Sequence, residues 1–175
     1  HGLETIKTIG DGYLVAAAVL GEFVSRPEEA ELAVEEYIEL LDALKSRGLD
    51  AYIHVKPTHL GLLIEQEMCV RNLRRILDTA ARNGQFVRMD MEDSPCTDGT
   101  LAVFHKLHGQ YENLGIVVQS RLRRTRDDVR ELAKVRANVR VCKGIYIEPY
   151  AISYTDPEII RRNFTVLVDD LMKAG

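Results

Sequence analysis

Short apolar runs alternate with longer segments of helical periodicity along most of the chain. Apolar residues at helical spacing predict a helix over residues 28–47, with Pro27 suited to its first turn and Gly48 to its C-terminal end. The next run, residues 51–56 (AYIHVK), is short and alternating, as a strand would be. Because strands separated by helices pair in parallel through right-handed crossovers, this alternation restricts the chain to the α/β class.

The pattern contains five strand-helix units. The predicted strands are residues 12–19, 51–56, 85–90, 115–119 and 139–143, and the predicted helices are residues 28–47, 66–82, 97–110, 125–135 and 157–173. Two architectures fit: five parallel β/α units of a TIM-like (β/α)8 barrel, or an open doubly wound, flavodoxin-like sheet. Length alone favours the open sheet, because a closed barrel usually needs about 250 residues. No linker or repeat divides the chain, so we expect a single α/β domain over residues 1–175.

Charge and cysteine content exclude several classes of partner. The net charge of −4 gives no reason to expect binding to nucleic acid or to an anionic membrane, and no apolar run approaches the roughly 20 residues of a transmembrane helix. The three cysteines lack C-x-x-C spacing, which indicates free thiols and a cytoplasmic location. His105 and His108 lie one helical turn apart, but no further ligands complete a metal site, so we expect no metal.

Polar residues close the predicted strands. Lys56, Asp90 and Gln119 end three of them, while Arg140 and Lys143 flank the last. Both architectures bind ligands at the carboxyl ends of their strands, so we expect these side chains to face one ligand. Strand alternation puts Arg140 and Lys143 on opposite faces, and we favour Arg140 for the site. The simpler alternative is that the strands end where solvent begins.

Three of these residues have competing interpretations. Lys56 and Asp90, on adjacent strands, could tune each other's charge, bind opposite ends of a zwitterion, or form a plain ion pair. Gln119 carries a donor and an acceptor, which suits the edge of a heterocycle but equally suits a loop cap.

Four motifs follow successive predicted strands in order: HVKPTHLGL, FVRMDMEDSP, GIVVQSRLRRT and VRVCKGIY. Together they resemble the proline dehydrogenase family, from about Leu20 in LGEF to Glu148. The resemblance implies a distorted (β/α)8 barrel that binds FAD. It also implies that a hydride passes from proline C5 to flavin N5, which yields 1-pyrroline-5-carboxylate in proline catabolism.

The resemblance also implies roles for individual residues. Lys56 matches a family lysine near the flavin and the substrate carboxylate, Asp90 an aspartate lining the same pocket, and Arg140 an arginine near flavin N5. Gln119 matches a glutamine that hydrogen-bonds the flavin ring. The remaining implied cofactor contacts are Val117, which would pack or hydrogen-bond through its backbone, and the loop residues Gly144 and Tyr146.

Some features depart from the family pattern. Ile145 stands where the family has alanine, and Ser120-Arg121 replaces a small residue followed by an aromatic one. The T-H motif and the R-x-x-R-R arginines of the last three barrel units do not follow the fifth unit. We therefore expect weak or absent FAD retention, little proline oxidation and self-association through open sheet edges. A non-catalytic α/β scaffold without cofactor is the alternative.

Two further stretches suggest other ligands. Residues 4–15 (ETIKTIGDGYLV) resemble a hairpin of class III nucleotide cyclases, with Lys7 matching a purine-reading lysine. The paired metal-binding aspartates of two-metal catalysis are not found, so a cyclase is only a remote alternative. The basic run at residues 121–126 (RLRRTR) could contact a pyrophosphate, although a solvated loop beside the site fits an acidic chain better.

Overall fold

The strands form one parallel sheet in the order of the sequence. The computed structural model describes residues 2–9 and 13–174. Its sheet runs β1 (Val15–Ala18), β2 (Ala51–Val55), β3 (Val87–Met89), β4 (Leu114–Gln119) and β5 (Asn138–Cys142). Each strand pairs in parallel with its neighbour in the sequence. A doubly wound sheet would reverse past its first strand, so this order rejects the length-based preference and identifies successive barrel units.

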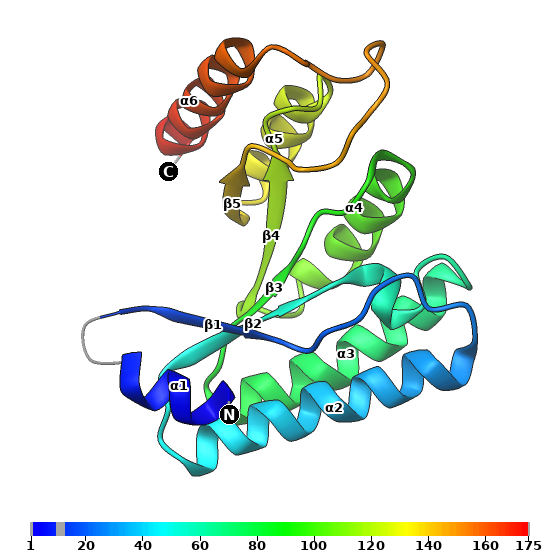
Figure 1. The fold of residues 1–175 in the computed structure, drawn as a ribbon, viewed down its shortest axis with the longest axis vertical. Helices are drawn as coiled ribbons and strands as arrows, with labels where there is room; N and C mark the ends of the chain where they lie inside the picture. Colours follow the sequence, from blue (N-terminus) through cyan, green and yellow to red (C-terminus); the bar gives the residue numbers. More distant parts are fainter. Residues whose placement is uncertain (1, 10–12, 175) are drawn as a thin grey trace.

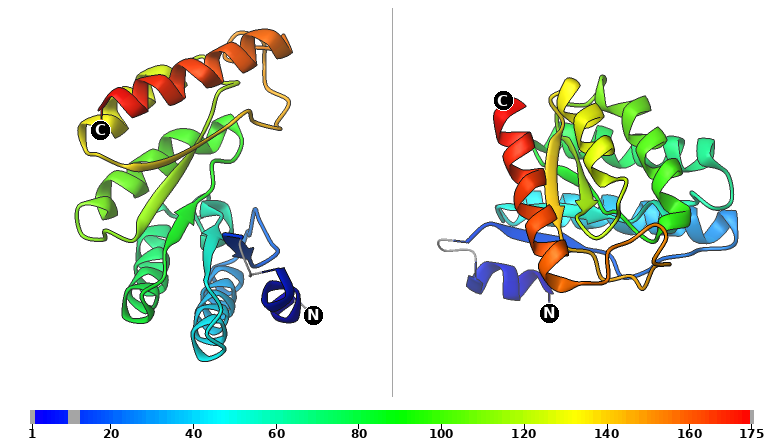
Figure 2. Two further views of the ribbon diagram at one scale, coloured as in Figure 1. Left: turned by 90° about the vertical axis from the view of Figure 1, so that its left-hand side faces the viewer. Right: turned by 90° about the horizontal axis from the view of Figure 1, so that it is seen from above.

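The helices lie along one face of this sheet. They are α2 (Pro27–Ser46), α3 (Gln66–Asn83), α4 (Ser94–His108), α5 (Thr125–Lys134) and α6 (Pro157–Ala174), and a 3-10 turn, η1 (Pro57–Leu60), follows β2. Figures 1 and 2 show these helices on the outer side of a strongly twisted sheet, with the opposite side open. Helix α4 begins three residues before its predicted start, because Pro95 is accommodated in its first turn. None of the described helices is long and apolar enough to cross a membrane.

The amino-terminal segment is helical where a hairpin was expected. Helix α1 (Gly2–Ile9) packs Leu3 and Ile6 against the core beside β1. The cyclase-like hairpin is therefore wrong for residues 4–9, and residues 10–12 lie outside the described part of the chain. The first predicted strand, residues 12–19, is observed only over Val15–Ala18.

Alternation along the strands separates the core from the open face. Ile53 and Val55 are fully buried toward the helices, and Val55 shares a register layer with Met89 and Ile116. The intervening residues point to the opposite face, where Val117 is the register partner of Arg140. Every residue of β4 is buried, so side chains on both faces of this strand are covered.

Gly115 lets one side chain cross the middle of the sheet. A Cβ atom at this position would lie 2.8 Å from the carbonyl oxygen of Asn138 and 2.9 Å from Nη1 of Arg88. Arg88 uses this space to reach β5, donating from Nη2 to Asn138 Oδ1 at 2.8 Å and from Nη1 to the Asn138 carbonyl at 3.3 Å. The glycine thus allows a link from β3 over β4 to β5.

We predict that Gly115→Ala lowers the free energy of unfolding by about 1–3 kcal/mol, because the added methyl group meets backbone as well as side-chain atoms. Urea unfolding of the two proteins measures the difference. Gly109→Ala is the matched control, since nothing lies within 4 Å of its added Cβ atom. The control should stay within about 0.5 kcal/mol of the wild type. Equal stability of the Gly115→Ala protein and the wild type would contradict the role of this glycine.

Candidate functional site

Three ionisable side chains meet on the open face near the carboxyl ends of the strands. Arg140 Nη2 donates to Asp90 Oδ1 at 3.1 Å, and His54 Nδ1 lies 2.7 Å from the same oxygen. The residues come from β5, from the end of β3 and from β2. Arg140 reaches Asp90 across β4, where Val117 is its register partner. The structure therefore brings together Asp90, Val117 and Arg140, three residues that the sequence singled out.

Lys56 lies at the same edge but pairs with another carboxylate. Its Nζ atom lies 2.5 Å from Oε2 of Glu22, in the loop between β1 and α2. Asp90 is engaged by His54 and Arg140 instead. The plain ion pair between Lys56 and Asp90, one of the three interpretations left open by the sequence, does not form, because the loop after β1 brings a carboxylate that strand order alone could not reveal.

Gln119 is buried and holds the loop that follows β3. Its Nε2 atom donates to the carbonyl oxygens of Met91 at 3.2 Å and Glu92 at 2.6 Å. Gly144, with a φ of +95°, passes so close that a Cβ atom there would lie 2.5 Å from Gln119 Oε1. The Gln119 amide thus acts as a loop cap here, and the loop after β5 packs directly against it.

The loop after β5 is tied to the basic run. Arg121 Nη1 donates to the carbonyl oxygen of Tyr146 at 3.1 Å. Burial raises the pKa of Tyr146 to about 12, so its phenol stays neutral near pH 7. The other arginines of residues 121–126 are also engaged: Arg123 with the rings of Tyr150 and Tyr154, Arg124 with Asp98 and Asp128, and Arg126 with Asp170. This run packs the protein's own loops and helices.

A buried carboxyl group that sequence reasoning did not select links three loops. Glu92 is fully buried, and its Oε2 and Oε1 atoms accept hydrogen bonds from Thr58 N at 2.9 Å and Thr58 Oγ1 at 2.5 Å. Thr58 Oγ1 in turn accepts from Phe23 N at 3.0 Å, and Phe23 has a left-handed φ of 53°. Burial raises the pKa of Glu92, while the Thr58 hydrogen bonds oppose that shift. The sequence did offer a signal for Glu92: it lies two positions after Asp90, so a continued strand alternation would place the two carboxyl groups on the same side.

The histidines do not gather into a metal centre. No group of three or more potential ligands is present among the residues that the structure describes. His108 Nε2 lies 2.9 Å from the carbonyl oxygen of Val135, and its ring stacks on Phe104 with the ring centroids 4.9 Å apart.

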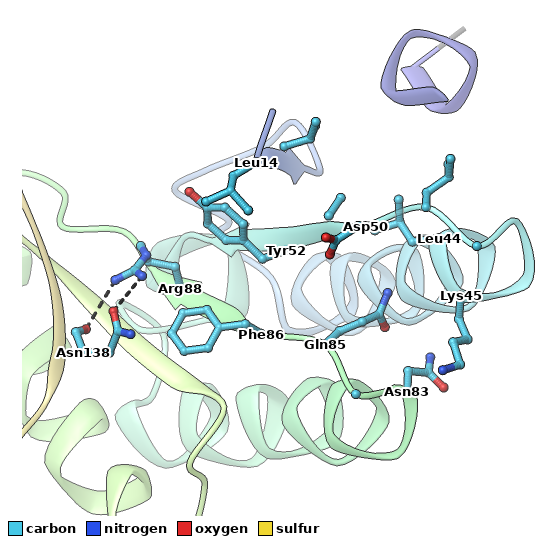
Figure 3. A pocket seen from close by; sticks show the side chains of 15 residues that line it. Leu14, Leu44, Lys45, Asp50, Tyr52, Asn83, Gln85, Phe86, Arg88 and Asn138 are labelled. Carbon is cyan, nitrogen blue, oxygen red and sulfur yellow. Dashed lines mark hydrogen bonds between the residues drawn. The ribbon is translucent and has the colours of Figure 1, made fainter. Parts of the chain in front are cut away.

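A separate pocket lies at the other end of the strands. It has a volume of about 580 Å³ and is lined partly by Tyr52, Phe86, Arg88 and Asn138, as Figure 3 shows. The Arg88 guanidinium is already bound to Asn138 and lies 5.0 Å from the centre of the Phe86 ring. We place the candidate site at the carboxyl ends instead, because ionisable groups converge there on an exposed face.

Comparison with known proteins gives one family. A family model for proline dehydrogenase matches residues 3–150. A proline dehydrogenase of Deinococcus radiodurans is 33% identical over 170 residues, covering 94% of this chain and 55% of that protein. Proline dehydrogenase 1 of Bacillus subtilis is 29% identical over 174 residues, covering 99% of this chain and 58% of that protein. The chain thus spans a little over half the length of these relatives.

Solved structures show the same fold. Proline utilization A from Bdellovibrio bacteriovorus superposes with a TM-score of 0.87 and 21% identity, over 98% of this chain and 23% of the other. The protein of that name from Corynebacterium freiburgense gives a TM-score of 0.81 and 22% identity, over 98% and 21% of the two chains. At this identity the similarity concerns the fold, and it agrees with successive barrel units.

The buried Glu92 carboxyl makes stability depend on pH in a defined direction. Because its pKa is raised in the folded protein, the native state holds a proton that the unfolded state releases above a pH of about 4.3. The Glu92 contribution is therefore largest at low pH and is lost as pH rises through the folded pKa.

We predict that the difference in free energy of unfolding, wild type minus Glu92→Gln, becomes smaller as the pH is raised from about 4 to about 8. Urea unfolding of both proteins across this range measures it. Glu131→Gln, which changes an exposed carboxyl on α5, is the control and should give a difference that varies little. A Glu92 difference that grows with pH would contradict the assignment.

Proposed function

The chain belongs to the proline dehydrogenase family, and from that premise we propose that it forms part of a site where L-proline is oxidised to 1-pyrroline-5-carboxylate with FAD. The observation that carries this proposal is the Asp90–Arg140 pair over Val117, at the end of the sheet where barrels bind ligands. Lys56 supplies a second cation at the same edge.

The groups at the strand ends suit a flavin in chemical kind. A flavin ring has apolar faces and an edge rich in hydrogen-bond acceptors. The Arg140 side chain, 44% exposed, offers donors, and beside it Val117 provides an apolar side chain that is 2% exposed. When bound, FAD would supply the hydride acceptor, and the protein would position it and set its electrostatic surroundings.

We assign the residues to two tasks. Arg140, Asp90, Val117, Gln119, Gly144 and Tyr146 would form the cofactor side of the site. Lys56 would attract the carboxylate of proline, in exchange for its contact with Glu22. These residues would then contribute to catalysis by orienting proline against the flavin and by placing fixed charges near the reacting atoms.

The open sheet edges support a partial barrel. Strands β1 and β5 each pair on one side only within the described sheet. We propose that further barrel strands cover these edges and complete the site, since the relatives are nearly twice as long. A chain without them would bury its edges by self-association or remain a scaffold without cofactor.

The cellular setting is also a proposal. Cys69, Cys96 and Cys142 are all free, which agrees with a reducing compartment such as the cytoplasm. The partners that we propose are proline, FAD and further strands of the barrel. The net charge of −4 gives no reason to add a nucleic acid.

We predict that the chain binds FAD and that Arg140→Ala weakens this binding at least about tenfold, since one hydrogen-bond donor with full charge is lost. Fluorescence quenching during titration with FAD gives the dissociation constants. Arg130→Ala, on the exposed side of α5, is the matched control and should bind like the wild type. Failure of the wild-type chain to bind FAD at any concentration tested would reject the proposal for this chain.

We further predict that Lys56→Ala lowers proline oxidation mainly through a higher KM for proline, because the lost charge would act on the substrate carboxylate. A dye-coupled assay with added FAD measures kcat and KM. Lys134→Ala, whose Nζ pairs with Glu131 on α5, is the control. Unchanged kcat and KM in Lys56→Ala would remove Lys56 from the site.

A further inference from the structure

We propose that His54 is a positioning residue of the strand-end site, which holds the Asp90 carboxylate so that one of its oxygens faces a bound ligand. Sequence motifs did not select His54 for this site. The proposal rests on the contact geometry of His54, Asp90 and Arg140, and its catalytic consequence rests on the proposed function.

Two donors converge on a single carboxylate oxygen. His54 Nδ1 and Arg140 Nη2 lie 2.7 Å and 3.1 Å from Asp90 Oδ1. No donor among the residues that the structure describes is within hydrogen-bond reach of Asp90 Oδ2. The Asp90 side chain is 23% exposed. One oxygen is therefore used by the protein, and the other can accept a donor from a ligand.

The two donors come from opposite directions. His54 belongs to β2 and Arg140 to β5, while Asp90 follows β3, with its backbone N–H donating to Val55 O at 2.9 Å. The terminal torsion of an aspartate is soft, so contact with Arg140 alone would let the plane of the carboxylate turn about the Cβ–Cγ bond. A second donor on the β2 side, at the same oxygen, fixes that plane and with it the direction in which the other oxygen points. His54 thereby supplies what the exposed arginine cannot.

The surroundings of His54 restrict its ring. Its side chain is 13% exposed, and the Tyr52 ring lies 5.2 Å away between centroids. Arg88, the register partner of His54, is turned to Asn138 and Ile116. Asp90, which Arg140 also contacts, is the only hydrogen-bond partner of the His54 ring among the described residues. Its carboxylate accepts, so the hydrogen of the imidazole belongs on Nδ1.

Nuclear magnetic resonance of the ¹⁵N-labelled chain tests the contact without reference to activity. Long-range ¹H–¹⁵N spectra of the imidazole rings at about pH 8, where a free imidazole is neutral, report which ring nitrogen carries hydrogen. We expect Nδ1 of His54 to be protonated in the wild type and to lose this preference in Asp90→Ala. An unprotonated Nδ1 in the wild type would overturn the proposal.

Two amide variants separate positioning from mere bulk. Asparagine places its amide nitrogen near the position of Nδ1, whereas glutamine places it near that of Nε2. His54→Asn should retain kcat/KM for proline within about threefold, and His54→Gln should lose roughly tenfold to a hundredfold as Asp90 turns. A purely structural role would make the two variants alike, and equal values would overturn the proposal.

His105→Asn, on the exposed side of α4, is the control for the chemical change and should match the wild type. If the wild type oxidises no proline, the proposed function fails while the imidazole spectra still decide the His54–Asp90 contact. If proline is oxidised and Nδ1 is unprotonated, the function stands and the role of His54 falls.

Discussion

Parallel pairing in sequence order is the constraint on which the rest of the structure depends. Each strand runs in the same direction beside its predecessor, so every carboxyl end lies at one edge of the sheet. The period of two along each strand then decides which side chains face the helices and which face the open side. Asp90 and Arg140, 50 positions apart in the chain, become neighbours for this reason alone.

The candidate site is held together largely by contacts among its own charges. Lys56 is matched by Glu22, and Asp90 by His54 and Arg140, so each cation already has a carboxylate partner. A ligand that carries a carboxylate must therefore displace a carboxylate of the protein from its cation, because both cations of this site already have a partner. Beneath this layer, Glu92 and Gln119 join the loops through buried hydrogen bonds, which keeps the exposed groups in a fixed arrangement.

The sequence predicted the units and the strand ends, because both follow from periodicity and from family motifs. It could not predict the partners: Glu22 reaches Lys56 from a loop whose path depends on Thr58, and His54 reaches Asp90 through strand register. Length alone favoured the open sheet, since an open sheet and part of a barrel can have the same number of units, but the family motifs favoured the barrel, and the strand order confirms them. The first helix was missed because a cyclase-like resemblance, and not periodicity, governed that stretch.

The backbone of Phe23 gives the Glu22 loop an unusual dependence on one side chain. Its left-handed φ is unfavourable for a non-glycine residue by roughly 1–3 kcal/mol, and its N–H group is satisfied by Thr58 Oγ1. Local preference would therefore draw this loop away from the shape it has. The hydroxyl that opposes this tendency is the same one that donates to Glu92. A single chain of hydrogen bonds thus connects the buried Glu92 carboxyl to the loop that holds Glu22 beside Lys56 at the surface.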